Sequence, residues 1–91
     1  MAEAIEDILR VGGGTQPDKL GSTIARKVVE GRKVVLRAVG APAVNQAVKG
    51  FIIAQEFVAS SGLVISLRGG FVDVPMPDKT VTGIILRVIV E

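Results

Sequence analysis

The sequence of 91 residues contains no cysteine, histidine, tyrosine or tryptophan. Without cysteine the chain can form neither a disulfide bond nor a thiolate metal site. Without histidine it lacks the commonest general base and the commonest transition-metal ligand. Carboxylates, lysines and hydroxyl groups are what remains for chemistry. We therefore expect no metal ion and no cofactor.

The carboxylates do not form a pair that is suited to catalysis. Glu6 and Asp7 are neighbours on a predicted strand, so their side chains point to opposite faces. Asp73 and Asp78 flank a turn that contains proline, where acidic residues are common for conformational reasons alone. We predict no catalytic residues and expect that the protein is not an enzyme.

Long hydrophobic runs are also missing. The longest has about four residues, whereas a helix needs roughly 20 apolar residues to cross a bilayer. The segment after Met1 is acidic and lacks the basic-then-apolar layout of a signal peptide. The sequence therefore predicts a cytoplasmic protein with no membrane partner.

Aromatic residues make up only 3% of the chain, although hydrophobic residues make up 48%. The core must then consist mostly of valine, isoleucine, leucine and alanine, which suits a sheet covered by helices. A chain of this length falls below the commonest domain size of about 100–150 residues. We expect a single domain over residues 1–91.

Apolar periodicity, interrupted by glycine and proline, divides the chain into alternating elements. The expected elements are a strand over 5–11, a helix that enters at 15–18 and stops at Gly31, a strand over 33–39, a helix over 42–60, a strand over 63–74 that is bulged or bent at Gly69 and Gly70, and a strand over 80–90. The long second helix is expected to be the central element on which the rest of the fold packs.

This order predicts an α+β fold, a βαβαββ two-layer sandwich in which two helices cover one face of a four-stranded mixed sheet. The other face is left uncovered in a monomer. Alternation places Arg10, Arg37 and Arg87 on that face, among valine and isoleucine side chains. The residues leave two interpretations open: the face is an interface, or the arginines only keep the sheet soluble.

The helix over 42–60 has two apolar sides. The side expected to pack on the sheet carries Val44, Ala47, Val48, Phe51, Ala54 and Val58. Gly50, Ile53 and Phe57 lie almost opposite, at about 100° per residue. We predict that this second side is an interface with another subunit.

The charge pattern gives only a broad indication of a partner. The net charge of +2 is weak evidence for a nucleic-acid ligand. Arg26, Lys27, Arg32 and Lys33 lie close together at the end of the first helix and the start of the next strand, although such a run is usually just a solvated helix end. The glycines at 12–14, followed by Lys19, could admit a nucleic-acid backbone, but they match neither the dinucleotide fingerprint nor a P-loop. The scarcity of aromatic residues argues against base-stacking platforms.

Residues 38–49, AVGAPAVNQAVK, resemble a segment of the stage V sporulation protein S family, whose members carry A-[IV]-G-A-x-A-[LV]-N-Q-A-V-K. The similarity covers most of the chain from about Val11 onward. That family in turn resembles the Alba superfamily of small DNA- and RNA-binding proteins. Those proteins share the element order and a G-x-x-[IV]-x-x-A-[VI] pattern, which is met here by Gly40, Val44, Ala47 and Val48.

The resemblance implies a protein that binds DNA or RNA as a homodimer or higher homo-oligomer, with a role in sporulation or developmental regulation. Binding would be to the phosphate backbone and not specific for sequence. The candidate contacts are Lys19, Arg26, Lys27, Lys33, Arg37, Asn45, Gln46 and Lys49.

Two departures from the Alba pattern predict modest affinity or a need for an assembled oligomer. The loop after the first strand lacks the lysines that Alba-type binders usually place there. At the last hairpin, Asp73 and Asp78 partly cancel Arg68 and Lys79. The alternative is a regulatory adaptor that binds another protein, through the uncovered sheet face or the surface of Ile53 and Phe57, without contacting nucleic acid.

Overall fold

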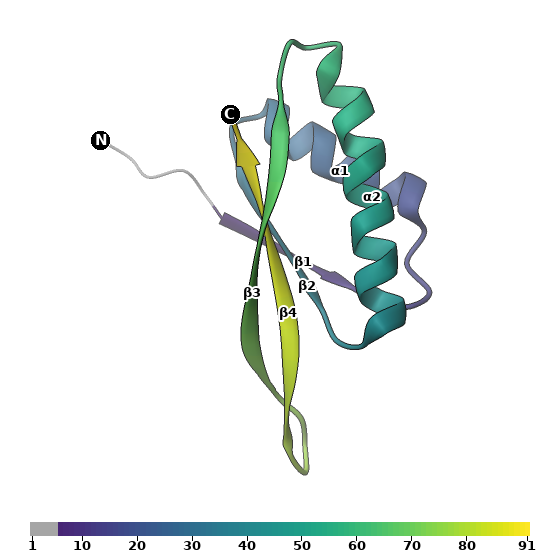
Figure 1. Ribbon diagram of the computed structural model, residues 1–91, viewed down its shortest axis with the longest axis vertical. Helices are drawn as coiled ribbons and strands as arrows, with labels where there is room; N and C mark the ends of the chain where they lie inside the picture. The colour runs from purple at the N-terminus through teal and green to yellow at the C-terminus, as the bar shows by residue number, and fades with distance from the viewer. Residues whose placement is uncertain (1–5) are drawn as a thin grey trace, which may run out of the picture.

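A computed structural model describes residues 6–91 and shows helices and strands in the predicted order (Figure 1). The elements are β1 (Glu6–Val11), α1 (Pro17–Val29), β2 (Lys33–Ala38), α2 (Ala41–Ala59), β3 (Ile65–Pro75) and β4 (Thr80–Val90). Their ends lie within about two residues of the predicted ones. Ile5, which was expected to start the first strand, lies outside the described residues.

The strands form one mixed sheet in the order β1-β2-β4-β3. β1 and β2 are parallel, whereas β4 runs antiparallel to both β2 and β3. Both helices pack on the same face of this sheet (Figure 1). The predicted α+β class and the two-layer arrangement are confirmed.

The core lies between the helices and the sheet, and the first residues of β3 contribute to it. Leu20, Ile24 and Val28 recur every fourth residue along α1 and are all buried, as the helical period predicts. Val48 of α2 was expected to pack on the sheet but is 37% exposed. The sheet-facing positions of α2 are Ala43, Ala47, Phe51, Ala54 and Val58. No helix among residues 6–91 is both long enough and apolar enough to cross a bilayer.

The two helices approach each other closely at a pair of glycines. A Cβ atom added to Gly21 would lie 2.6 Å from Ile53 Cγ2 and 2.9 Å from the carbonyl oxygen of Gly50. A Cβ atom added to Gly50 would lie 2.6 Å from Leu20 Cδ2. Gly50 and Ile53, which were predicted to contact another subunit, pack instead against α1 of the same chain. Phe57, on the next turn, is 50% exposed.

β3 and β4 form a long hairpin whose tip extends beyond the helices (Figure 1). The pairing runs without interruption from Ile65 opposite Val90 to Pro75 opposite Thr80. Gly69 and Gly70 pair with Leu86 and Ile85 in this register. The predicted bulge does not form, because glycine weakens a strand but does not by itself insert an unpaired residue.

Candidate nucleic-acid interface

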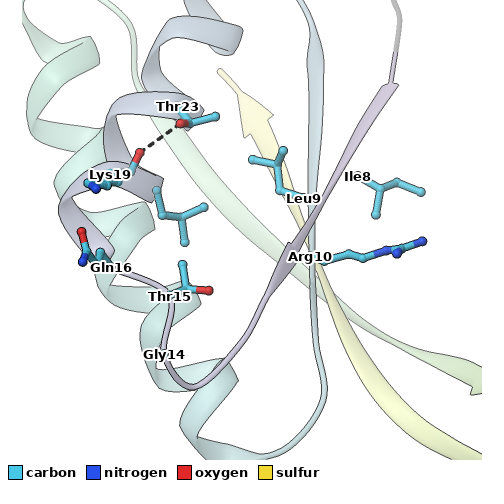
Figure 2. Close-up of a pocket in the computed structure, with 9 residues that line it drawn as sticks. Ile8, Leu9, Arg10, Gly14, Thr15, Gln16, Lys19 and Thr23 are labelled. Carbon is cyan, nitrogen blue, oxygen red and sulfur yellow. Dashed lines mark hydrogen bonds between the residues drawn. The ribbon is translucent and has the colours of Figure 1, made fainter. Parts of the chain in front are cut away.

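The sheet face opposite the helices carries a repeated pattern of cations and apolar side chains. Leu9 and Leu36 pack toward the helices, so their neighbours along each strand point to the other face. Figure 2 shows Leu9 directed toward α1, with Ile8 and Arg10 directed away from it. The placement of Arg10, Arg37 and Arg87 that alternation predicted is confirmed.

The arginines of this face form a diagonal band, with one arginine from each strand. Arg10 of β1 lies directly opposite Arg37 of β2. Arg87 of β4 pairs with Val35, two residues along β2 from Arg37. Arg68 of β3 lies directly opposite Arg87. We call Arg10, Arg37, Arg87 and Arg68 the arginine band.

Positive charge on this face greatly exceeds negative charge. The cationic side chains are Arg10, Lys33, Arg37, Arg68 and Arg87, and Glu6 is the acidic one among the described strand residues. Glu6 Oε2 accepts a hydrogen bond from Arg87 Nη1 at 2.8 Å. Within residues 6–91, no carboxylate lies within ion-pair distance of Arg10, Arg37 or Arg68. The band is therefore a concentrated positive surface on a chain whose overall charge is only +2.

Apolar side chains fill the spaces between these cations. Val35, in the middle of the face, is only 3% exposed although no helix covers it. Ile8 and Ile89 remain largely exposed on either side. The stems of long arginine side chains commonly cover apolar surface in this way while the guanidinium groups stay in water.

Lys27, one of the predicted contacts, is held instead in an ion-pair cluster on the helix side of β1. Arg32 binds Asp7 with two hydrogen bonds, one of them from Nη2 to Oδ1 at 2.7 Å. Lys27 Nζ donates to Asp7 Oδ2 at 3.0 Å. The hydrogen bonds from Arg32, and then the one from Lys27, hold the pKa of Asp7 well below its usual range. Glu6 and Asp7 do point to opposite faces, as predicted.

This cluster predicts a loss of stability in acid. A carboxyl whose pKa is depressed in the folded state stabilises that state at pH values above its unfolded pKa of about 3.9. The stabilisation disappears as the pH falls through and below that value. We expect the Asp7→Asn substitution to lower the free energy of unfolding at pH 7, and the difference from wild type to shrink between about pH 5 and pH 2.

Urea unfolding of both proteins across this pH range measures the difference. The matched control is Glu6→Gln, which removes the more exposed pair with Arg87 and is expected to have the smaller effect at pH 7. A difference for Asp7→Asn that stays constant with pH would contradict the assignment.

The other predicted contacts do not gather on one surface. Lys33 and Arg37 lie on the face of the arginine band, whereas Lys19 and Arg26 lie on α1. Gln46 Nε2 donates to the carbonyl oxygen of Thr15 at 2.9 Å, so it ties α2 to the loop before α1. Asn45 and Lys49 are exposed on α2. Among the predicted residues, Lys33 and Arg37 share the face of the arginine band, while Asn45 and Lys49 lie one turn apart on α2.

The glycine loop after β1 forms an ordered turn. Thr15 Oγ1 accepts a hydrogen bond from the Gly12 N–H at 2.8 Å, and the Thr15 N–H donates back to the Gly12 carbonyl at 3.1 Å. An open pocket of about 770 Å³ lies between this loop, β1 and α1. Lys19 lines its helix side, while Arg10 points away from α1 (Figure 2). Among residues 6–91, no three acidic side chains gather into a group that could hold a metal ion.

A second exposed feature lies on the helix side of the hairpin. Phe71 of β3 is 81% exposed although it lies on the side of the sheet on which the helices pack. With Ile84 of β4 and Val44 and Val48 of α2, it lines an open pocket of about 660 Å³. We call these residues the hairpin patch. Large exposed apolar groups that gather in this way are typical of interaction surfaces.

A comparison with protein families agrees with the resemblance noted at residues 38–49. The family model for Stage V sporulation protein S (SpoVS) matches residues 7–91. The match begins earlier than the similarity in the sequence indicated and includes every helix and strand of the fold except the first residue of β1.

Proposed function

The chain belongs to the stage V sporulation protein S family, and we propose that it is a non-enzymatic cytoplasmic protein that binds the phosphate backbone of nucleic acids as a homodimer. The observation that carries this proposal is the arginine band. A helix-free sheet face with five cationic side chains and Glu6 as its described acidic residue is a surface that attracts a polyanion.

The chemistry of this face favours contacts to phosphate over contacts to bases. Guanidinium groups bind phosphate oxygens with charge-assisted, often paired hydrogen bonds. Such contacts supply affinity and position but carry no information about sequence. The four arginines of one protomer would displace counterions from two to four phosphates, which makes the affinity depend on salt.

Assembly into a homodimer would place two arginine bands in one particle. We assign the contact between protomers to the hairpin patch, since Phe71 is the most exposed large apolar side chain among the described residues. A second copy is the favoured occupant because a two-fold contact lets Phe71 of each protomer enter the pocket of the other. Two linked bands bind one polymer more tightly than either alone, which compensates for modest affinity per protomer.

Binding should therefore weaken steeply with added salt. For two to four phosphate contacts per protomer, we expect the affinity of one protomer to fall roughly 10- to 100-fold between 50 and 200 mM salt. Fluorescence anisotropy with labelled duplex DNA and duplex RNA measures this slope. Arg37→Gln should reduce both the affinity and the slope, whereas Arg26→Gln, at an exposed site on α1, should change neither appreciably. An affinity that does not depend on salt would exclude binding to the backbone.

A regulatory adaptor that binds another protein is the second candidate, and the exposed hairpin patch favours it. In that case the patch would bind a different protein and the arginine band would not contact nucleic acid. The same titrations separate the two functions. No binding to DNA or RNA at 50 mM salt would favour the adaptor.

A further inference from the structure

We infer that the arginine band works as two phosphate clamps, Arg10 with Arg37 and Arg68 with Arg87, and that its ligand is a double-stranded nucleic acid. This inference rests on the proposed function and deepens it. It assigns the contacts to particular pairs of guanidinium groups and selects a duplex over a single strand.

The register places the members of each pair side by side. Arg10 and Arg37 are direct partners on adjacent strands, as are Arg68 and Arg87. Adjacent strands lie about 4.8 Å apart, so both guanidinium groups of a pair can reach the same phosphate. Like charges directly opposite each other on a sheet are unfavourable unless something neutralises them. A bound phosphate is the neutralising group that suits two convergent guanidinium groups.

The two clamps remain available for a ligand in different ways. Within residues 6–91, Arg10 and Arg37 have no acidic partner. Arg87 donates to Glu6 through Nη1, and a guanidinium group has five N–H donors, so others stay free for phosphate. Arg37 is half-buried between the neighbouring strands. Its hydrogen bonds to phosphate would therefore be less weakened by water than those of a fully exposed cation.

The spacing of the clamps favours a rigid ligand. Their centres are two strand spacings and two residues apart, which corresponds to about 12 Å on a regular sheet. A duplex holds its phosphates at fixed positions, so two clamps can be occupied together without ordering a flexible chain. Proteins that bind single strands usually add aromatic side chains on which bases stack. The described residues of this face include no aromatic side chain, since Phe71 lies on the helix side.

The test compares charge-conserving variants. Arg10→Lys/Arg37→Lys keeps the charge of the first clamp but loses the paired hydrogen-bond geometry of arginine. We expect it to weaken binding to a 20-base-pair DNA duplex about tenfold at fixed salt, with little change in the salt slope. Arg26→Lys is the matched control on α1 and should bind as wild type does. The wild-type chain should prefer the duplex to either of its separated strands.

A measurement without ligand tests the repulsion within the clamp. We expect Arg10→Gln to raise the melting temperature of the free protein slightly, because it removes one of two like charges that lie opposite each other. The same variant should lose affinity for the duplex. A melting temperature below that of wild type would give Arg10 a structural role and overturn the clamp.

The remaining outcomes separate the inference from the proposed function. The Arg10→Lys/Arg37→Lys variant could bind the duplex within twofold of the wild-type affinity. That result would mean that only the positive charge of the face matters, and it would overturn the clamps while leaving nucleic-acid binding in place. Equal affinity for single strands and duplex would overturn the choice of ligand. If polyglutamate competes for the arginine band as well as the duplex does, the ligand of the band is an acidic protein and not a nucleic acid. No binding of the wild-type chain to any nucleic acid would overturn the proposed function itself.

Discussion

The Phe71→Asp variant is expected to stay monomeric at concentrations where the wild-type chain forms the proposed homodimer. Phe71 is 81% exposed in the isolated chain and faces the pocket between the hairpin and α2. A central aromatic residue of an interface contributes about 2 kcal/mol or more, and a two-fold contact contains it twice. Losing about 4 kcal/mol raises the dissociation constant of the dimer roughly 1,000-fold.

Sedimentation equilibrium over a dilution series measures this dissociation constant. Phe57→Asp is the matched control, because Phe57 is also an exposed phenylalanine but lies on a different side of α2. The sequence alone placed the interface at Phe57. A dimer that persists in Phe71→Asp and dissociates in Phe57→Asp would return the contact to that side.

The Gly21→Val substitution is expected to destabilise the fold by about 3 kcal/mol, at the upper end for overpacked sites. The new Cβ atom would meet two carbon atoms of Ile53 and the carbonyl oxygen of Gly50 at distances below 3.0 Å. The side chain of Ile53 can change its rotamer, but the backbone of Gly50 can move only if α2 shifts away from α1. The gain in helix propensity over glycine, below about 1 kcal/mol, does not offset this cost.

Urea unfolding at neutral pH measures the loss, with Gly14→Val as the control. A Cβ atom at Gly14 would have no neighbour within 4 Å, and the φ angle of Gly14 is not positive. We expect the control to change the stability by less than about 1 kcal/mol. If Gly21→Val and Gly14→Val unfold at the same urea concentration, the close helix contact does not limit the fold.

The fold was largely predictable because its elements have strong periodic patterns. The stripe of Leu20, Ile24 and Val28 and the alternation in the strands set the type and order of the elements. The roles of glycine were not predictable, since the residue type is compatible with several of them. Gly69 and Gly70 continue a paired strand, whereas Gly50 permits two helices to touch. Only the partner at each position distinguishes these roles, and that partner is distant in sequence.

The candidate site was predictable only in part for a similar reason. Alternation placed Arg10, Arg37 and Arg87 on one face, but Arg68 was missed as a member because a bulge was expected directly after it. The diagonal order of the band depends on β4 lying between β2 and β3, which no local pattern shows. Lys27 was wrongly expected to be free for nucleic acid. Its partner Asp7 is 20 residues away in the chain, so the local sequence did not show the ion pair. An acidic residue on the apolar side of a strand was the available signal for that ion pair.

The place of β4 in the sheet also affects how the chain can fold while it is being synthesised. β4 is the last of the four strands to be made, yet it is the one that joins β3 to β2. Until its residues emerge from the ribosome, β2 has an unpaired edge and β3 has no partner. Such edges invite pairing with other chains. The nascent protein therefore passes through a stage at which both helices are complete but the sheet is not, and a delay in synthesis at that stage would favour aggregation.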